Sequence, residues 1–168
     1  MAPINKIKKR LHLRPEAEEF LYSISKVKTL LKGEVLIRQG DVVKKTFFVT
    51  AGCLRSYCID KNGKEHTLQF AIKDWWISDY IAIHTDELAT LTVECLTESK
   101  VIEFNAKELD GIHERFPEFE SYQRHNLERH VVSLHKRILN QLQLSAADRY
   151  DLFLKQYPVI EQHTRNFH

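Results

Sequence analysis

A succession of short β-prone runs between Glu34 and Phe104 constrains the fold of this chain more than any other feature of its sequence. Turn-forming pairs such as Gly-Asp, Ala-Gly, Asn-Gly and Asp-Glu separate these runs. In chain order the runs read VLIR, TFFVT, CLRSYCI, HTLQFAI, TLTVECL and KVIEF. Many short strands with regular turn signals are typical of a β-sandwich or a β-barrel. We therefore expect a mainly β domain across this part of the chain.

Glycine marks the predicted ends of these strands. Four of the five glycines lie at such edges, where a positive φ angle or a tight bend favours glycine: Gly33, Gly40, Gly52 and Gly63. The pair Asn62-Gly63 is typical of a type I′ turn, in which both central residues have positive φ. The sequence therefore predicts a β-hairpin that joins CLRSYCI to HTLQFAI.

Helical patterns flank the β-rich segment. Before it, apolar residues from Pro15 to Leu31 recur at helical or irregular spacing, which predicts a short leading helix and a turn that ends at Gly33. After it, Asn105 is a predicted N-cap, and a long helix is expected from about Pro117 to Leu144. Ser145 begins a further predicted helix that stops before Pro158.

The long helix carries an apolar seam. Its residues are spaced 4, 3 and 4 apart, which is the spacing of a coiled coil: Leu127, Val131, Leu134 and Ile138. The seam covers only about two heptads, fewer than the three or four that identify a coiled coil from sequence alone. Two interpretations follow, namely pairing with a second chain and packing on the chain's own β domain.

From its charge, hydropathy and cysteine content, we expect this chain to be an ordinary cytoplasmic protein. A net charge of +2 over 168 residues does not by itself point to nucleic acid. The one basic cluster is N-terminal, and we interpret it as a solvated segment: Lys6, Lys8, Lys9, Arg10 and Arg14. No apolar run is long enough for a membrane span or a signal peptide. Three cysteines without a Cys-x-x-Cys motif, Cys53, Cys58 and Cys95, fit buried thiols in a reducing compartment.

Motifs for catalysis and metal binding are missing from the sequence. The nine histidines form neither His-x-His nor His-Glu-x-x-His, and no phosphate-binding, dinucleotide or nucleophile-elbow motif occurs. We therefore predict no catalytic residue, no metal and no cofactor. His66 and His84, with Glu65, match a cupin-type metal centre in residue type but not in spacing. A cupin-like metalloenzyme is for this reason the weakest of the alternatives.

Three sequence segments resemble the cyclic-nucleotide-binding-like sensor domain of the Crp/Fnr transcription regulators. They are KGEVLIRQGD (32–41), FFVTAGCLRSY (47–57) and DKNGKEHTLQF (60–70), and the resemblance runs from about Leu30 to Leu144. It implies an α+β, mainly β fold, a double-stranded β-helix or jelly-roll barrel with a leading helix and a long helix that pairs two subunits. The domains would be a sensor at 1–115, a dimerisation helix at 116–144 and a connector at 145–168.

The resemblance also identifies a segment that holds the ligand in the cyclic-nucleotide members of the family. Here that segment reads WISDYIAIHTDELATLTV (76–93). Ser78 stands for a glycine, Asp79 for the ribose-binding glutamate, Ala89 for the phosphate-pairing arginine and Thr90 for a serine. Alanine cannot pair with a phosphate, so a response to cyclic AMP is not expected. The candidate pocket residues are Trp76, Ser78, Asp79, Tyr80, Ala89 and Thr90.

The resulting expectation is the effector-sensing and dimerisation part of a Crp/Fnr-like transcription regulator. Its partners would be a second copy of the chain, an unknown small-molecule effector and DNA. In the family a C-terminal helix-turn-helix contacts the DNA, and this sequence ends at TRNFH, about where that module would begin. A stand-alone small-molecule-binding module without DNA binding is the alternative, and the choice depends on whether the natural chain continues beyond His168.

Overall fold

The computed structural model describes residues 14–157, and the chain divides into two compact units, residues 1–115 and 116–168. The basic residues Lys6, Lys8, Lys9 and Arg10 and the final TRNFH lie outside the described residues. No described helix is both long and apolar enough to cross a membrane.

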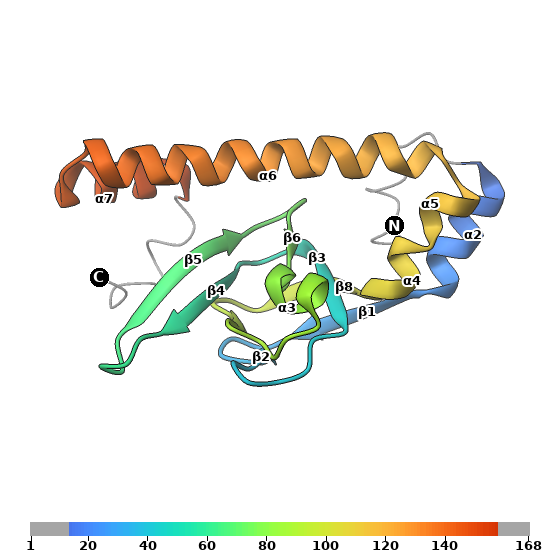
Figure 1. The fold of residues 1–168 in the computed structure, drawn as a ribbon, viewed down its shortest axis with the longest axis horizontal. Helices are drawn as coiled ribbons and strands as arrows, with labels where there is room; N and C mark the ends of the chain where they lie inside the picture. The colour runs from blue at the N-terminus through green and yellow to red at the C-terminus, as the bar shows by residue number, and fades with distance from the viewer. Residues whose placement is uncertain (1–13, 158–168) are drawn as a thin grey trace. The chain divides into compact units, whose positions relative to one another are not determined.

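Eight strands of the first unit form two separate four-stranded antiparallel sheets (Figure 1). One sheet has the order β1-β8-β3-β6 and the other β2-β7-β4-β5, so strands distant in sequence are neighbours in space. The expected mainly β jelly-roll fold with helices is thereby confirmed, although the sheets do not close into one barrel. The strands are β1 (Ser25–Leu30), β2 (Val35–Ile37), β3 (Lys45–Ala51), β4 (Leu54–Ile59), β5 (Glu65–Ala71), β6 (Trp76–Ile77), β7 (Thr92–Cys95) and β8 (Ser99–Asn105).

Helices begin and end the β unit and interrupt it once. Helix α2 (Pro15–Ser23) leads, α3 (Tyr80–Thr85) lies between β6 and β7, and α4 (Ala106–Asp110) and α5 (Ile112–Arg115) follow β8. As predicted, Asn105 caps α4 by accepting hydrogen bonds from the backbone N–H groups of Lys107 and Glu108.

The leading helix is shorter than the sequence pattern suggested. Residues Ser25–Leu30 form strand β1, which pairs along its full length with β8. This edge strand was missed because Lys26 and Lys28 lie on the same face as the buried Leu30, so the sequence shows no apolar face. Strand β6 was missed because it contains only two residues.

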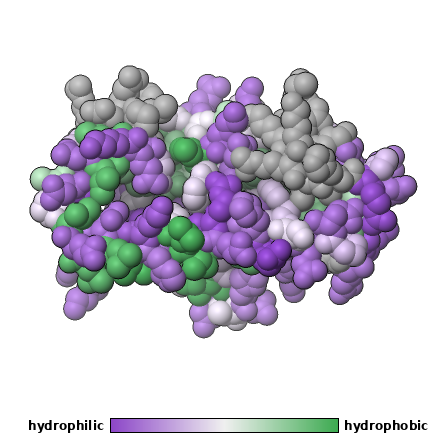
Figure 2. Space-filling model, turned by 90° about the horizontal axis from the view of Figure 1, so that it is seen from above, coloured by the Kyte–Doolittle hydropathy of each residue, from purple (hydrophilic) through white to green (hydrophobic). Residues whose placement is uncertain are grey.

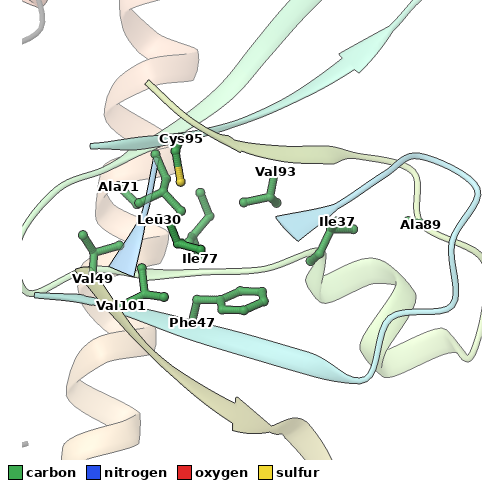
Figure 3. Packing of buried hydrophobic residues seen from close by; sticks show 11 residues of the cluster. Leu30, Ile37, Phe47, Val49, Ala71, Ile77, Ala89, Val93, Cys95 and Val101 are labelled. Carbon is green, nitrogen blue, oxygen red and sulfur yellow. The ribbon is translucent and has the colours of Figure 1, made fainter. Parts of the chain in front are cut away.

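The main hydrophobic core lies between the two sheets. Side chains from the facing strands meet there, as the labelled sticks in Figure 3 show. Because side chains alternate along a strand, Phe47 and Val49 of β3 enter this core while Phe48 points to the opposite face. Full burial of such a side chain contributes about 1.5–3 kcal/mol to folding. The core residues are Leu30, Ile37, Phe47, Val49, Leu54, Ala71, Ile77, Ala89, Val93, Cys95 and Val101.

The hairpin between β4 and β5 is present, but its predicted type I′ turn is wrong. Gly63 has φ +80°, whereas Asn62 does not have positive φ. The Asp60 carboxylate instead accepts hydrogen bonds from the backbone N–H groups of Asn62 (2.8 Å) and Lys64 (3.0 Å). A three-residue loop with one glycine in the left-handed region results, because the aspartate stabilises that turn locally.

Gly52 is the glycine on which the β unit depends most. Its φ is +83°, and an added Cβ would lie 2.7 Å from Ser99 Cα and closer still to Ser99 Oγ and the Glu98 carbonyl oxygen. The turn between β3 and β4 therefore requires glycine both for its backbone angle and for the close approach of the 98–99 backbone.

The second unit is dominated by α6 (Glu118–Gln143), 26 residues long, followed by α7 (Ala146–Gln156). Pro117 precedes α6 in a helical conformation, as predicted. Ser145 caps α7, because its Oγ accepts a hydrogen bond from the Asp148 N–H at 3.2 Å.

Candidate functional site

The segment between β6 and β7 carries most of the predicted ligand residues, and we refer to residues 76–91 as the cassette. It consists of β6, helix α3 and the chain that leads into β7 (Figure 1). Its last part is fixed by backbone pairing, since Val42 and Leu88 form an isolated bridge and the Ala89 N–H donates to the Asp41 carbonyl at 2.8 Å.

Asp79 is the organising residue of the cassette. Its side chain is fully buried, and Oδ1 accepts from the Ala82 N–H at 3.1 Å, which caps α3. Oδ2 accepts from the Thr90 N–H (2.7 Å), the Thr90 hydroxyl (3.0 Å) and the Leu91 N–H (2.8 Å). The carboxylate therefore joins the two ends of the cassette.

Ser78 and Ala89 are also buried, and both are held by residues outside the cassette. The Ser78 hydroxyl donates to the Lys45 carbonyl at 2.7 Å, so it is engaged with the backbone of β3. Ala89 is 4% exposed and belongs to the main core, where its carbonyl accepts from the Gly40 N–H at 2.7 Å. The position that the resemblance assigns to a phosphate-pairing arginine is thus a small apolar contact with no charge.

Of the two aromatic candidates, Trp76 lies on the face of its sheet opposite the main core. Trp76 pairs with Phe48 across β6 and β3, and its ring lies 5.1 Å from that of Phe48 and 5.5 Å from that of Phe104. Its neighbour Ile77 enters the core between the sheets, so Trp76 points away from that core. Tyr80 is half-buried at the start of α3.

The structure therefore brings together only part of the predicted set. Asp79 and Thr90 are in direct contact, whereas Trp76 lies on the sheet face opposite the core. The assignment of these residues to a ligand pocket stays a prediction.

Sequence reasoning missed a buried arginine on the outer face of the β2-β7-β4-β5 sheet. Arg55 is 3% exposed, and its Nε donates to Glu94 Oε1 at 2.7 Å while Nη2 donates to Glu65 Oε2 at 2.6 Å. The guanidinium also lies 4.1 Å from the centre of the Tyr57 ring. Burial, followed by the charges of Glu94 and Glu65, raises the pKa of Tyr57. The alternation of Arg55 and Tyr57 along β4 was the available signal.

A second ion cluster joins three strands of the other sheet. Glu103 of β8 pairs with Lys28 of β1 at 2.6 Å and with Lys45 of β3 at 2.8 Å. Burial by itself would raise the pKa of Glu103, but the hydrogen bonds and charges of the two lysines hold it below the usual value. Both clusters tie neighbouring strands together.

The histidines that suggested a cupin-type centre are placed differently. His66 Nε2 lies 2.9 Å from Asp60 Oδ2 at the hairpin, and His84 is exposed on α3. Within residues 14–157, no group of three or more histidine, cysteine, aspartate or glutamate side chains is arranged to hold a metal ion.

The predicted apolar seam is exposed along α6. Leu127, Val131, Leu134 and Ile138 are between 41% and 57% exposed. Figure 2 shows one face of the molecule, on which hydrophobic side chains, in green, lie between hydrophilic ones, in purple. Pairing of two chains through this seam stays a prediction.

Comparison with known proteins identifies the β unit. No match was found among curated protein sequences. Among solved structures, a protein of the Crp/Fnr family from Eubacterium rectale is 17% identical with a TM-score of 0.72, covering 90% of this chain and 70% of that one. The c-di-GMP responsive global regulator of Xanthomonas campestris is 12% identical with a TM-score of 0.68, covering 84% of this chain and 71% of that one.

The Catabolite Activator Protein of Thermus thermophilus is 15% identical with a TM-score of 0.60, and the match covers 75% of this chain but only 59% of that one. These structures confirm, at the level of the fold, the resemblance found in the strand motifs. The family model described as "Cyclic nucleotide-binding domain" matches residues 27–116, more than half of the chain. The chain therefore belongs to the cyclic nucleotide-binding domain family.

Proposed function

We propose that this chain is the effector-sensing and dimerisation part of a Crp/Fnr-type transcription regulator that does not respond to cyclic AMP. The observation that carries the proposal is a cyclic nucleotide-binding domain followed in the sequence by a 26-residue helix with an exposed apolar seam. The similarity in fold to the Crp/Fnr protein from Eubacterium rectale supports it.

The homodimer in this proposal forms through α6. Four apolar residues at coiled-coil spacing leave water when two such helices pair, which supplies the driving force. The positions around them carry charge, as with Arg124 and Glu128, whose side chains are 3.7 Å apart and exposed. Such flanking charges keep the apolar contact confined to the seam.

The effector differs from cyclic AMP because the cassette contains no lysine or arginine to pair with a phosphate. A charge-assisted hydrogen bond contributes about 1.5–3 kcal/mol, and Ala89 cannot make one. That difference corresponds to about ten- to a hundredfold in affinity. A fold of this type can serve another effector, since the Xanthomonas campestris relative is described as c-di-GMP responsive.

In the proposed mechanism, an effector bound at the β unit shifts an equilibrium between two arrangements of the paired α6 helices. DNA contact through a further helix-turn-helix domain would then respond to that shift. The effector can move the equilibrium only by the difference between its affinities for the two arrangements. Regulation therefore requires that effector binding and DNA binding strengthen or weaken each other reciprocally.

The test of this function uses the chromosomal gene with an added epitope tag. We expect crosslinking and immunoprecipitation to enrich discrete DNA sites that have two-fold symmetry, as a dimeric reader requires. An untagged strain is the control. No enrichment under any growth condition, combined with a saturable effect of a small molecule on the purified protein, would replace the regulator with the stand-alone binding module.

The effector prediction is tested on the purified chain. Cyclic AMP up to millimolar concentration should leave the melting temperature unchanged, with AMP as the matched control nucleotide. A saturable rise with cyclic AMP alone would show that the cassette binds it without an arginine at position 89.

A further inference from the structure

Three hydrogen-bond donors of the cassette converge on one point. The Thr90 N–H, the Thr90 hydroxyl and the Leu91 N–H all donate to Oδ2 of Asp79 at 2.7–3.0 Å. These donors belong to the chain that leads into β7 and are not the N-terminal N–H groups of helix α3. Successive backbone N–H groups that point to one position, here with a hydroxyl beside them, form a concavity suited to an anion.

The anion in that concavity is the carboxylate of Asp79, a residue of the same chain. Asp79 is fully buried, and no lysine, arginine or histidine of the described residues pairs with its carboxylate. Burying a charge without a counter-ion is costly unless hydrogen bonds compensate for the lost hydration. Four donors do so here, one on Oδ1 and three on Oδ2.

Two features keep an external anion from replacing Asp79. A second anion near these donors would be repelled by the carboxylate, since like charges in a buried site disfavour each other. The neighbouring Ala89, 4% exposed and packed in the core, provides no cation to offset that repulsion. The donor set is therefore complete without a ligand.

We propose that Asp79 is a specificity-determining residue, an internal anion that occupies this donor set and excludes external phosphate or carboxylate groups from it. The cassette is consequently ordered without a ligand. If the domain is a sensor, as proposed above, Asp79 also restricts its effectors to molecules with no anionic group at this position.

The test removes the internal anion and supplies an external one. Asp79→Ala should melt at a lower temperature than the parent protein, and sodium formate, the smallest carboxylate, should recover at least half of that loss in a saturable manner. Sodium chloride at the same ionic strength should not. Inorganic phosphate should act on the variant as formate does, and neither anion should shift the melting temperature of the parent protein.

Glu87→Ala is the matched control, because Glu87 is an exposed carboxylate of the same cassette. Its melting temperature should respond equally to formate and chloride. Equal responses of Asp79→Ala to formate and chloride would overturn the proposal, because the donors would then not bind a free carboxylate. A saturable formate effect on the parent protein would overturn it too.

A second variant covers the case in which Asp79→Ala does not fold. Asp79→Ser keeps an N-cap for α3, because serine is among the preferred capping residues, but it withdraws the oxygen from Thr90 and Leu91. The same formate response is expected. If neither variant folds in buffer, refolding is compared in formate and chloride, and equal yields contradict the proposal. The readout needs no DNA, so its failure and the failure of the regulator function are separate results.

Discussion

Apolar residues are largely buried in the β unit but largely exposed along helix α6. In the β unit, Phe47, Val49 and Val93 are almost completely buried between two sheets of the same chain (Figure 3). On α6, Leu127 and Ile138 remain more than half exposed. The first region obtains its hydrophobic stabilisation within one chain, whereas the second still has apolar surface to bury.

This difference separates two kinds of stability. A core completed within one chain is stabilised equally at every protein concentration. Apolar surface that is buried only on association is stabilised by mass action, so its contribution grows with concentration. We therefore expect the unfolding of the β unit and the pairing of α6 to respond to different mutations.

Phe47→Ala should have the largest effect. It removes a fully buried ring from the main core and leaves a cavity, which lowers the free energy of unfolding by about 3–5 kcal/mol. Urea denaturation followed by circular dichroism measures this loss. Ile59→Ala, an exposed apolar residue of β4, is the control and should cost less than about 1 kcal/mol. Equal losses would show that the core is less tightly packed than described.

Gly52→Ala should follow, at about 2–4 kcal/mol, because a left-handed φ angle and a collision with residues 98–99 act together. Gly63→Ala separates the two causes. Gly63 has a similar φ of +80° but open space around it, so its substitution should cost only the backbone strain, about 1 kcal/mol. If the two variants unfold at the same urea concentration, the close approach at Gly52 contributes nothing.

Leu134→Glu tests the other side of the comparison. Placing one charge per chain in the seam should weaken self-association about a hundredfold, or about 3 kcal/mol, without changing the fold of the β unit. Val132→Glu is the matched control, since Val132 is also about half exposed but lies roughly 160° away around the helix. Sedimentation velocity over a dilution series measures both.

A monomeric parent protein at micromolar concentration would remove the basis for pairing. Equal effects of the two substitutions would instead place the contact on a wider face of α6 than the seam.

The sequence was most informative where local chemistry decides the structure. Strands β3, β4 and β8 were evident from β-branched and aromatic runs, and Asn105 and Ser145 acted as the caps that their positions indicated. Strand β1 could not be recognised, because its pairing with β8 joins residues 69 to 79 positions apart and compensates for its lysines. Tertiary context outweighed the local pattern there.

The candidate site shows the same contrast between local sequence signals and long-range contacts. The cassette was located by its motif, but the contact of Asp79 with Thr90 and Leu91 spans 11 and 12 positions and has no periodic signature. The partners of Arg55 lie up to 39 positions away, so the alternation along β4 could assign Arg55 to a face of the strand but could not show its burial. Local rules located Asp79 and Thr90 but not Arg55, and in both cases the choice of partner depended on the tertiary structure.

The smallest predicted effect concerns the pH dependence of the β unit at the exposed hairpin between β4 and β5. Hydrogen bonds from His66, and then from the backbone N–H groups of Lys64 and Asn62, lower the pKa of Asp60 from 3.8 to about 2. Because the folded-state pKa lies below the unfolded one, this stabilisation is complete above about pH 4 and is lost as the pH falls toward 2. The melting temperature of Asp60→Asn should therefore fall less steeply over that range than that of the parent protein. Glu87 is an exposed carboxylate of the cassette, so the melting temperature of Glu87→Gln should fall with pH as steeply as that of the parent protein. If Asp60→Asn also falls as steeply as the parent, the hairpin is stabilised by Gly63 and its backbone pairing rather than by the carboxylate.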